Sequence, residues 1–390
     1  MSQSAGAAPY WRLSGFYFFY FASLGALVPS MSPYLKSLSY SPTQIGILIG
    51  ITMATKVIAP NIWGWIADHT GKRMAIVRGG CLFAAVIFVG IFFNHSFVWL
   101  AIVFGAFSFF WNAALPQFEA TTFNHLTQEE HRYSSIRLWG SIGFILTVVG
   151  LGYVFEYLSI SLFPWIVLSL LVAIWLSSLI VPESAAGHFP LEHESLRKVL
   201  RKPHVAGLLF ACFCMQASHG PYYAVYSIYM QSYDYSSHLT GWLWGIGVIA
   251  EVVMLLFMQR LFKRVSLRAL LIFSLWVACC RWILIALFPQ HLWVMLIAQS
   301  MHAVTFGVYH VTAIQLIHRL FKGRHQGRGQ ALYSSLSFGA GGAIGSIYSG
   351  FAWDYFGRSW VFGLSVAFAM LGLWVAYRYV KVEPATPYTA

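Results

Sequence analysis

Charge is the scarcest property of this 390-residue chain, because Asp, Glu, Lys and Arg together make up only 9% of it. A soluble globular domain carries about 25% charged residues, so a water-exposed surface over most of the chain is excluded. In place of charge, 58% of the residues are hydrophobic and 18% are aromatic. The composition predicts an integral membrane protein that contacts a lipid bilayer.

Cysteines and acidic residues are also few, with 5 Cys and 12 Asp and Glu. All five cysteines lie in apolar stretches, and Cys212-Phe213-Cys214 lacks the spacing of a zinc site. We therefore predict packing cysteines, no metal and no cofactor. The motifs His-Glu-x-x-His and Gly-x-Ser-x-Gly are absent, as are paired aspartates within apolar stretches, which argues against a membrane enzyme. A channel is disfavoured because the charges are mixed rather than a ring of one sign.

Long apolar segments account for most of the chain. Each is near or above the ~20 residues that cross the hydrocarbon core as a helix. The predicted spans are 13–36, 43–67, 74–93, 97–123, 134–155, 161–181, 204–230, 239–261, 267–288, 291–319, 330–352 and 359–380. The fold class is therefore an all-α polytopic membrane protein with twelve transmembrane helices. The first segment, near Leu13, is expected to be a retained helix rather than a cleaved signal.

An internal repeat divides these spans. Tyr133-Ser134-Ser135 opens the fifth span and Tyr333-Ser334-Ser335 the eleventh, while Gly46-x-x-x-Gly50 and Gly241-x-x-x-Gly245 match between the second and eighth. Both offsets skip six helices, so the repeats are parallel. The prediction is two pseudo-symmetric six-helix bundles, 1–182 and 204–390, joined by a hydrophilic cytoplasmic linker at 183–203.

Basic residues set the orientation. If both termini are cytoplasmic, most of the 24 Lys and Arg lie at cytoplasmic loops and helix ends, as the positive-inside rule requires. This distribution explains the net charge of +12 without nucleic acid as a partner.

Ionisable side chains inside the spans are the first candidates for function. Each costs about 2.5 to 3.5 kcal/mol at membrane depth, so it normally faces a partner or a wet cavity. Glu119 and Arg137 lie eighteen residues apart on consecutive spans and suggest a cavity, with a structural ion pair as the alternative. Lys56 is placed opposite Glu251 by the repeat; apolar neighbours would let Glu251 carry a proton near neutral pH.

Further polar and aromatic residues lie within the second half. Arg281 could bind a carboxylate in bidentate fashion or pair with Glu251, and both readings stay open. His219 and His302 could act in transport or form packing hydrogen bonds. Tyr222 and Tyr223 could contact an aromatic ring; they follow Pro221, which could loosen a moving helix.

The loop after the second span reads Gly64-Trp65-Ile66-Ala67-Asp68-His69-Thr70-Gly71-Lys72-Arg73. It resembles the loop signature of the major facilitator superfamily, a gating element at the cytoplasmic face. Gly64 would permit close helix approach and Gly71 a tight turn. Asp68 would interact with the positive end of a neighbouring helix, and Lys72 and Arg73 would hold the loop at the cytoplasmic face. The corresponding loop at Gln259–Arg264 keeps only the basic charge.

Glu119 and Arg137, the latter within Arg137-Leu138-Trp139-Gly140-Ser141-Ile142-Gly143-Phe144, resemble the lactose permease branch of oligosaccharide:proton symporters. The resemblance implies that Glu119 and Arg137 bind substrate and that Phe144 stacks on it. Glu251, Arg281 and His302 match that branch's substrate and coupling residues in order. The branch's coupling glutamate is replaced by Thr305, and Gln299 stands where a Lys would precede it, so Glu251 or His302 must take a larger share of any proton coupling.

The chain is similar over nearly its full length to the phenylpropionate permease family of this superfamily. The blocks that carry the similarity are Arg137–Ser141, Gln216–Tyr223, Gly247–Val252, Cys280–Trp282 and His302–Phe306. They imply a proton-coupled symporter for a small organic carboxylate, aromatic or not, such as 3-phenylpropionate, working by alternating access. We further expect a monomer in the cytoplasmic (inner) membrane of a bacterium, with a small-molecule substrate and a proton as its partners. The alternatives are a sugar or nucleoside symporter, a drug-efflux antiporter, and a transporter-like membrane sensor.

Overall fold

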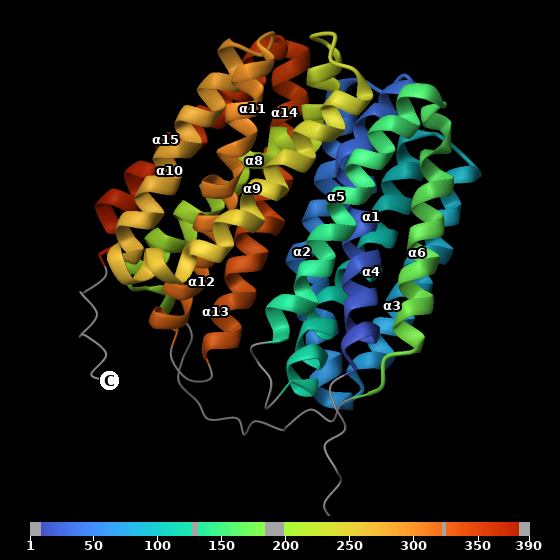
Figure 1. Ribbon diagram of the computed structural model, residues 1–390, viewed down its shortest axis with the longest axis horizontal. Helices are drawn as coiled ribbons and strands as arrows, with labels where there is room; N and C mark the ends of the chain where they lie inside the picture. Colours follow the sequence, from blue (N-terminus) through green and yellow to red (C-terminus); the bar gives the residue numbers. More distant parts are fainter. Residues whose placement is uncertain (1–8, 127–131, 184–198, 322–324, 382–390) are drawn as a thin grey trace, which may run out of the picture. The chain divides into compact units, whose positions relative to one another are not determined.

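The computed structural model describes residues 9–126, 132–183, 199–321 and 325–381. Within these residues the chain is helical and contains no strand (Figure 1). Ten helical segments of this part are long and apolar enough to cross a membrane. The predicted all-α polytopic fold is confirmed. Most of the predicted linker, 184–198, lies outside the described residues.

Two compact units divide the chain, 1–38 with 58–191 and 39–57 with 192–390. Helix α2 therefore begins in the second unit and ends in the first. The predicted boundaries at 182 and 203 remain a prediction.

The first unit contains the N-terminal helices. Their bounds are α1 Tyr10–Ser37, the later part of α2 Pro42–Thr70, α3 Arg73–Phe88 with the 3₁₀ turn η1 Val89–Phe92, α4 Phe97–His125, α5 Tyr133–Tyr157, and α6 Phe163–Leu179 after the 3₁₀ turn η3 Ile160–Leu162. Helices α1 and α5 approach closely because glycines line their contact: a Cβ at Gly25 would lie 2.8 Å from the Phe144 carbonyl oxygen.

The second unit contains the remaining helices. Their bounds are α8 Pro203–Gln231, α9 Ser237–Arg264, α10 Leu267–Leu287, α11 Leu292–Ser300, α12 Tyr309–Leu320, α13 His325–Ser334, α14 Gly342–Phe356 and α15 Arg358–Tyr379. Two π-helical segments, η4 Ala303–Val308 and η5 Ser335–Gly341, join α11 to α12 and α13 to α14. Such π segments are frequent at functional sites.

Helix α8 is the most buried helix of the second unit and is less apolar than the membrane-crossing helices around it. It packs against α14 and α15, and its backbone nearly touches that of α14: a Cβ at Gly345 would lie 2.7 Å from the Gly220 Cα. Although Pro221 lies inside it, α8 is one α-helix from Pro203 to Gln231. The irregular segments of this unit are instead η4 and η5.

Helix ends follow local sequence chemistry. Ser236 and Ser266 cap α9 and α10, each side chain accepting a hydrogen bond from a backbone N–H in the first turn. Gly71 and Gly357 take positive φ, 67° and 90°, between successive helices, where a residue with a Cβ would be strained.

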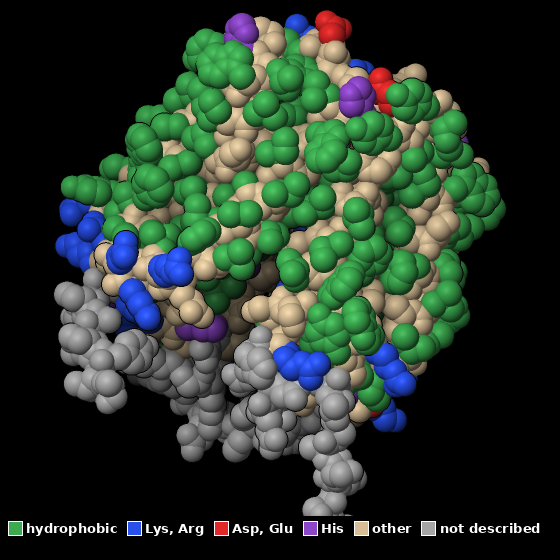
Figure 2. All heavy atoms as spheres, viewed as in Figure 1, with side chains coloured by type: hydrophobic (Ala, Val, Ile, Leu, Met, Phe, Trp, Pro, Cys, Tyr) green, Lys and Arg blue, Asp and Glu red, His purple; other side chains and the backbone are tan. Residues whose placement is uncertain are grey.

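Apolar side chains cover most of the face shown in Figure 2. Large exposed hydrophobic residues occur in both units, Trp165, Trp276 and Trp374 among them. A surface of this kind is suited to lipid rather than to water. The polar and charged side chains that remain inside each unit are therefore the exceptions that need a function or a partner.

Candidate functional site

Glu119 of α4 and Arg137 of α5 meet in the first unit. The Arg137 Nε lies 4.0 Å from the Glu119 Oε1, and the two side chains are 31% and 35% exposed. The contact is an open ion pair rather than a closed bidentate one. Both groups therefore keep hydrogen-bonding capacity for another molecule.

Aromatic rings of α1 hold Arg137 in place. Its guanidinium carbon lies 3.8 Å from the ring centroid of Phe21 and 5.6 Å from that of Tyr17, distances typical of cation–π contacts. Gly140 makes this arrangement possible, since a Cβ there would lie 2.8 Å from both the Phe21 ring and the Arg137 Nη1. The Arg137–Gly140 spacing thus has a direct packing reason.

Phe144 lies two helical turns beyond Arg137 on α5 and is 8% exposed. Its carbonyl contacts Gly25 of α1. The stacking role implied by the lactose permease resemblance stays a prediction.

The loop between α2 and α3 is organised around Arg73. Its Nη2 donates to the Asp68 Oδ1 at 2.8 Å and its Nη1 to the Gln117 Oε1 of α4 at 2.8 Å. The Asp68 side chain is 66% exposed. Gly64 faces the same glutamine, because a Cβ there would lie 3.7 Å from the Gln117 Nε2. Arg73 therefore links α2, α3 and α4 at one end of the first unit.

Arg281 of α10 is the centre of a second polar cluster, within the second unit. It is fully buried. Its Nη1 donates to the Thr305 Oγ1 at 3.0 Å and contacts the His302 Nδ1 at 3.1 Å, and its Nη2 donates to the Gln299 Oε1 at 3.2 Å. The Nε has no hydrogen-bond partner. No carboxylate among the described residues lies within ion-pair distance of it, so Arg281 is a buried cation held by uncharged groups.

Two aromatic rings flank the same guanidinium. Its central carbon lies 4.6 Å from the ring centroids of Tyr222 and Trp282. Tyr222 donates its hydroxyl hydrogen to the Gln299 Oε1 at 3.0 Å, and the Gln299 Nε2 donates to the Tyr226 Oη at 2.6 Å. The Gln299 carbonyl thus accepts from both Tyr222 and Arg281, which fixes its orientation.

His302 connects Arg281 to Glu251 of α9. Arginine has only donors, so the His302 Nδ1 accepts from Arg281, and in the neutral ring the Nε2 carries the hydrogen. That Nε2 lies 3.8 Å from the Glu251 Oε2. Arg281 and Glu251 form no direct ion pair, and the two are joined through the imidazole.

Space for Glu251 comes from the π segment η4. A Cβ at Gly307 would lie 3.0 Å from the Glu251 Cγ, a contact tighter than ordinary packing allows. Gly247 similarly faces His302, with a Cβ 3.4 Å from the His302 Cβ. Glycines on both sides therefore admit the bulky titratable groups between α9 and η4.

His219 and Tyr223 lie beside this cluster. His219 is fully buried, and its Nδ1 donates to the Met215 carbonyl oxygen at 2.8 Å, while its Nε2 has no partner. Its ring lies 4.8 Å from Trp282 and 6.1 Å from Tyr223. Lys56 lies in the part of α2 that belongs to the second unit. The functional role predicted for Lys56 stays a prediction.

Several site residues were not singled out by sequence reasoning. Gln299 and Thr305 were treated only as departures from a related pattern, although both contact Arg281. Tyr226 lies one turn after Tyr222 on the same face of α8, and Tyr17 one turn before Phe21 on α1. The available signal was this i, i+4 spacing of aromatic residues. Among the described residues, no group of three His, Cys, Asp or Glu side chains is placed to hold a metal ion.

Comparisons with known proteins agree with this architecture. The chain is 28% identical over 361 residues to the "Probable 3-phenylpropionic acid transporter" of Escherichia coli (strain K12), covering 91% of this chain and 94% of that protein. It is 27% identical over 345 residues to the "Maltose permease" of Geobacillus stearothermophilus, covering 86% of each.

Solved structures share the fold. A mutant of the nucleoside transporter NupG superposes with a TM-score of 0.85 at 15% identity, over 95% of this chain and 100% of that one. A bacterial homologue of the human lysosomal transporter Spinster superposes with a TM-score of 0.76 at 13% identity, over 97% and 100%. The MFS_1 like family matches residues 10–364. The chain therefore belongs to the MFS_1 like family and is a multi-pass transporter of the major facilitator superfamily, not an enzyme.

Proposed function

We propose that this transporter is a proton-coupled symporter that imports a small aromatic carboxylate such as 3-phenylpropionate by alternating access. The observation that carries the proposal is Arg281, a fully buried cation whose described contacts are all to uncharged groups. An isolated buried charge is costly. An anionic cargo would supply the missing counter-charge.

The hydrogen-bonding geometry favours a carboxylate in particular. The Arg281 Nη1 has both of its hydrogens directed at His302 and Thr305, and the Nη2 uses one of its two on Gln299. The Nε has no hydrogen-bond partner, and we propose that it and the neighbouring Nη2 form the edge of the guanidinium that receives the cargo. A carboxylate matches such an edge with two parallel hydrogen bonds.

Aromatic walls support an aromatic cargo. Tyr222 and Trp282 flank the guanidinium, and Tyr223 lies next to Tyr222 with ring centroids 5.5 Å apart. A phenyl ring attached through a short chain to the bound carboxylate would meet these faces at offset or edge-on geometries. The similarity to the E. coli protein named for 3-phenylpropionic acid points to the same cargo class.

Proton coupling is assigned to Glu251 and His302. The chain Arg281–His302–Glu251 links the proposed anion site to a carboxyl group. When Glu251 is ionised, it attracts the hydrogen on the His302 Nε2 and so favours the neutral tautomer whose Nδ1 accepts from Arg281. Protonation of Glu251 removes that attraction, so loading of the proton and of the anion are coupled through one imidazole.

Residues of the first unit complete the proposal. Glu119, Arg137 and Phe144 are proposed to contact the cargo from that unit, and the Gly64–Arg73 loop to take part in gating. We propose that the protein is a monomer in the bacterial cytoplasmic membrane. Its basic loops support an orientation with both termini inside.

Neutral cargoes are the main alternative. The maltose permease similarity and the NupG fold would suit a sugar or a nucleoside. Such a molecule offers no counter-charge to Arg281, which is why a carboxylate is preferred. A drug-efflux antiporter would move its cargo out of the cell, and a sensor would bind cargo without exchanging it across the membrane. The transport assay described next tests both alternatives.

The decisive experiment uses purified protein in proteoliposomes with an imposed pH gradient. Uptake of labelled 3-phenylpropionate is compared with uptake of maltose and uridine, and counterflow is measured without a gradient. We expect saturable, gradient-driven accumulation of the acid alone, together with counterflow. Equal uptake of maltose or uridine would reject the carboxylate assignment, and binding without counterflow would indicate a sensor.

A further inference from the structure

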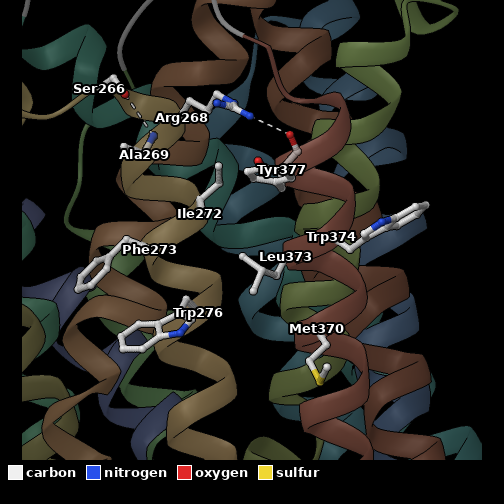
Figure 3. A pocket seen from close by; sticks show the side chains of 10 residues that line it. All are labelled: Ser266, Arg268, Ala269, Ile272, Phe273, Trp276, Met370, Leu373, Trp374 and Tyr377. Carbon is white, nitrogen blue, oxygen red and sulfur yellow. Dashed lines mark hydrogen bonds between the residues drawn. The ribbon is translucent and has the colours of Figure 1, made fainter.

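An open groove of about 690 Å³ runs between α10 and α15 on the surface of the second unit. Ile272 and Leu373 point toward one another between the two helices and form its floor (Figure 3). Its rims carry Trp276 and Trp374, which are 54% and 58% exposed. In a membrane-spanning chain these apolar walls face lipid.

One end of the groove is closed by Arg268 of α10 (Figure 3). Its Nε donates to the Val380 carbonyl oxygen at 2.7 Å and its Nη2 to that of Tyr377 at 2.8 Å, and these bonds hold the guanidinium against the end of α15. The Nη1 has no hydrogen-bond partner among the described residues. Arg268 therefore presents an oriented donor at the mouth of an apolar groove.

The surroundings of Arg268 carry charge of one sign. The flanking stretches 259–270 and 374–381 contain no acidic residue. Their other basic residues are Arg260, Lys263, Arg264, Arg378 and Lys381. A basic cluster at the membrane surface attracts anionic headgroups.

The length of the groove fits one leaflet. From Arg268 to Trp276 the rise along α10 is about 12 Å at 1.5 Å per residue, while half of the hydrocarbon core is about 15 Å thick. A molecule with its phosphate at Arg268 would therefore place an acyl chain along most of the groove.

We propose that this groove binds one anionic phospholipid, with its phosphate on Arg268 and an acyl chain over Ile272 and Leu373. A second copy of the chain is a poorer occupant. Two copies in the same membrane orientation would bring their Arg268 ends together, and the like charges would repel.

The test is lipid binding to the delipidated, full-length protein in detergent, followed by native mass spectrometry. Dioleoylphosphatidylglycerol is titrated against dioleoylphosphatidylcholine. We expect one phosphatidylglycerol to bind at least about tenfold more tightly than phosphatidylcholine. Arg268→Gln should abolish the preference, and Arg12→Gln, at an exposed arginine of α1 that does not line the groove, should keep it.

A second variant guards against a folding effect, because Arg268 also caps α15. Ala269→Phe fills the groove and leaves Arg268 intact; Ala75→Phe, at an exposed alanine of α3, is its matched control. Melting temperatures confirm that each variant is folded. Equal affinity of the wild type for the two lipids, or equal behaviour of Ala269→Phe and Ala75→Phe, overturns the proposal, as does a dimer that Ala269→Phe dissociates.

Discussion

Replacement of Arg281 by Gln tests the proposed anion site most directly. The Arg281 guanidinium is fully buried, and its Nε has no hydrogen-bond partner. Loss of one partner of a buried, hydrogen-bonded charge pair costs about 2 to 5 kcal/mol. At the lower limit, the Kd for 3-phenylpropionate should rise about 30-fold, since about 1.4 kcal/mol is tenfold.

Thermal stabilisation by ligand converts this change into a measurement. At a concentration of 100 times the wild-type Kd, ligand binding stabilises the folded protein by about 2.7 kcal/mol. A Kd raised 30-fold leaves about 0.9 kcal/mol at the same concentration. The ligand-induced rise in Tm of Arg281→Gln should therefore fall to about a third of the wild-type value.

Two controls separate charge recognition from loss of folding. Arg260→Gln removes an exposed arginine of α9 and should show the full rise in Tm. The neutral analogue 3-phenylpropionamide should raise the Tm of the wild type only weakly, and it should raise the Tm of Arg281→Gln by at least as much. If the amide stabilises the wild type as strongly as the acid, or if Arg281→Gln keeps the full shift with the acid, the reasoning is refuted.

Three further substitutions have defined outcomes. Glu251→Gln should abolish accumulation of 3-phenylpropionate driven by a pH gradient while counterflow continues, and retained accumulation would assign the proton elsewhere. Gly345→Ala should lower the free energy of unfolding by roughly 1 to 3 kcal/mol or more, and with it the Tm, because the new Cβ would lie 2.5 Å from the Ala217 carbonyl oxygen. The control is Gly363→Ala, whose Cβ would meet only the Trp360 ring at 3.6 Å. Thr305→Glu should place a carboxylate against Arg281 and weaken binding of 3-phenylpropionate at least about 30-fold, with the amide less affected; an unchanged preference for the acid in equilibrium binding would contradict this.

The helices were predictable because each span is a long apolar run, and this signal does not depend on tertiary contacts. The predicted span 204–230 corresponds to α8 Pro203–Gln231, and the predicted 97–123 to α4 Phe97–His125. The π segments η4 and η5 were not predictable, because their backbone hydrogen bonds span five residues instead of four and no change of hydrophobicity marks them. Their glycines were visible in the sequence, but the close contacts that require Gly307 depend on the neighbouring α9.

The members of the site were partly predictable for a similar reason. Buried charges are rare enough in membrane spans that Glu119, Arg137, Glu251 and Arg281 stand out individually. Their pairing depends on helix rotation, which the sequence leaves open. Both partners considered for Arg281 were charged groups, whereas its contacts in the structure are Gln299, His302 and Thr305. The repeat also aligned Lys56 with Glu251, yet repeat-related positions lie on different helices and need not touch.

Thr305 explains how cargo charge and proton coupling depend on each other in this proposal. The lactose permease branch has a glutamate at the corresponding place, which could neutralise the neighbouring arginine permanently. Here Thr305 accepts a hydrogen bond from Arg281 at 3.0 Å but brings no charge. The counter-charge must then come from a group that arrives, and a carboxylate cargo is such a group. Because His302 contacts Arg281 and faces Glu251, arrival of the anion and protonation of Glu251 act on the same imidazole. The presence of Thr305 in place of a glutamate therefore links the choice of cargo to the coupling of its transport.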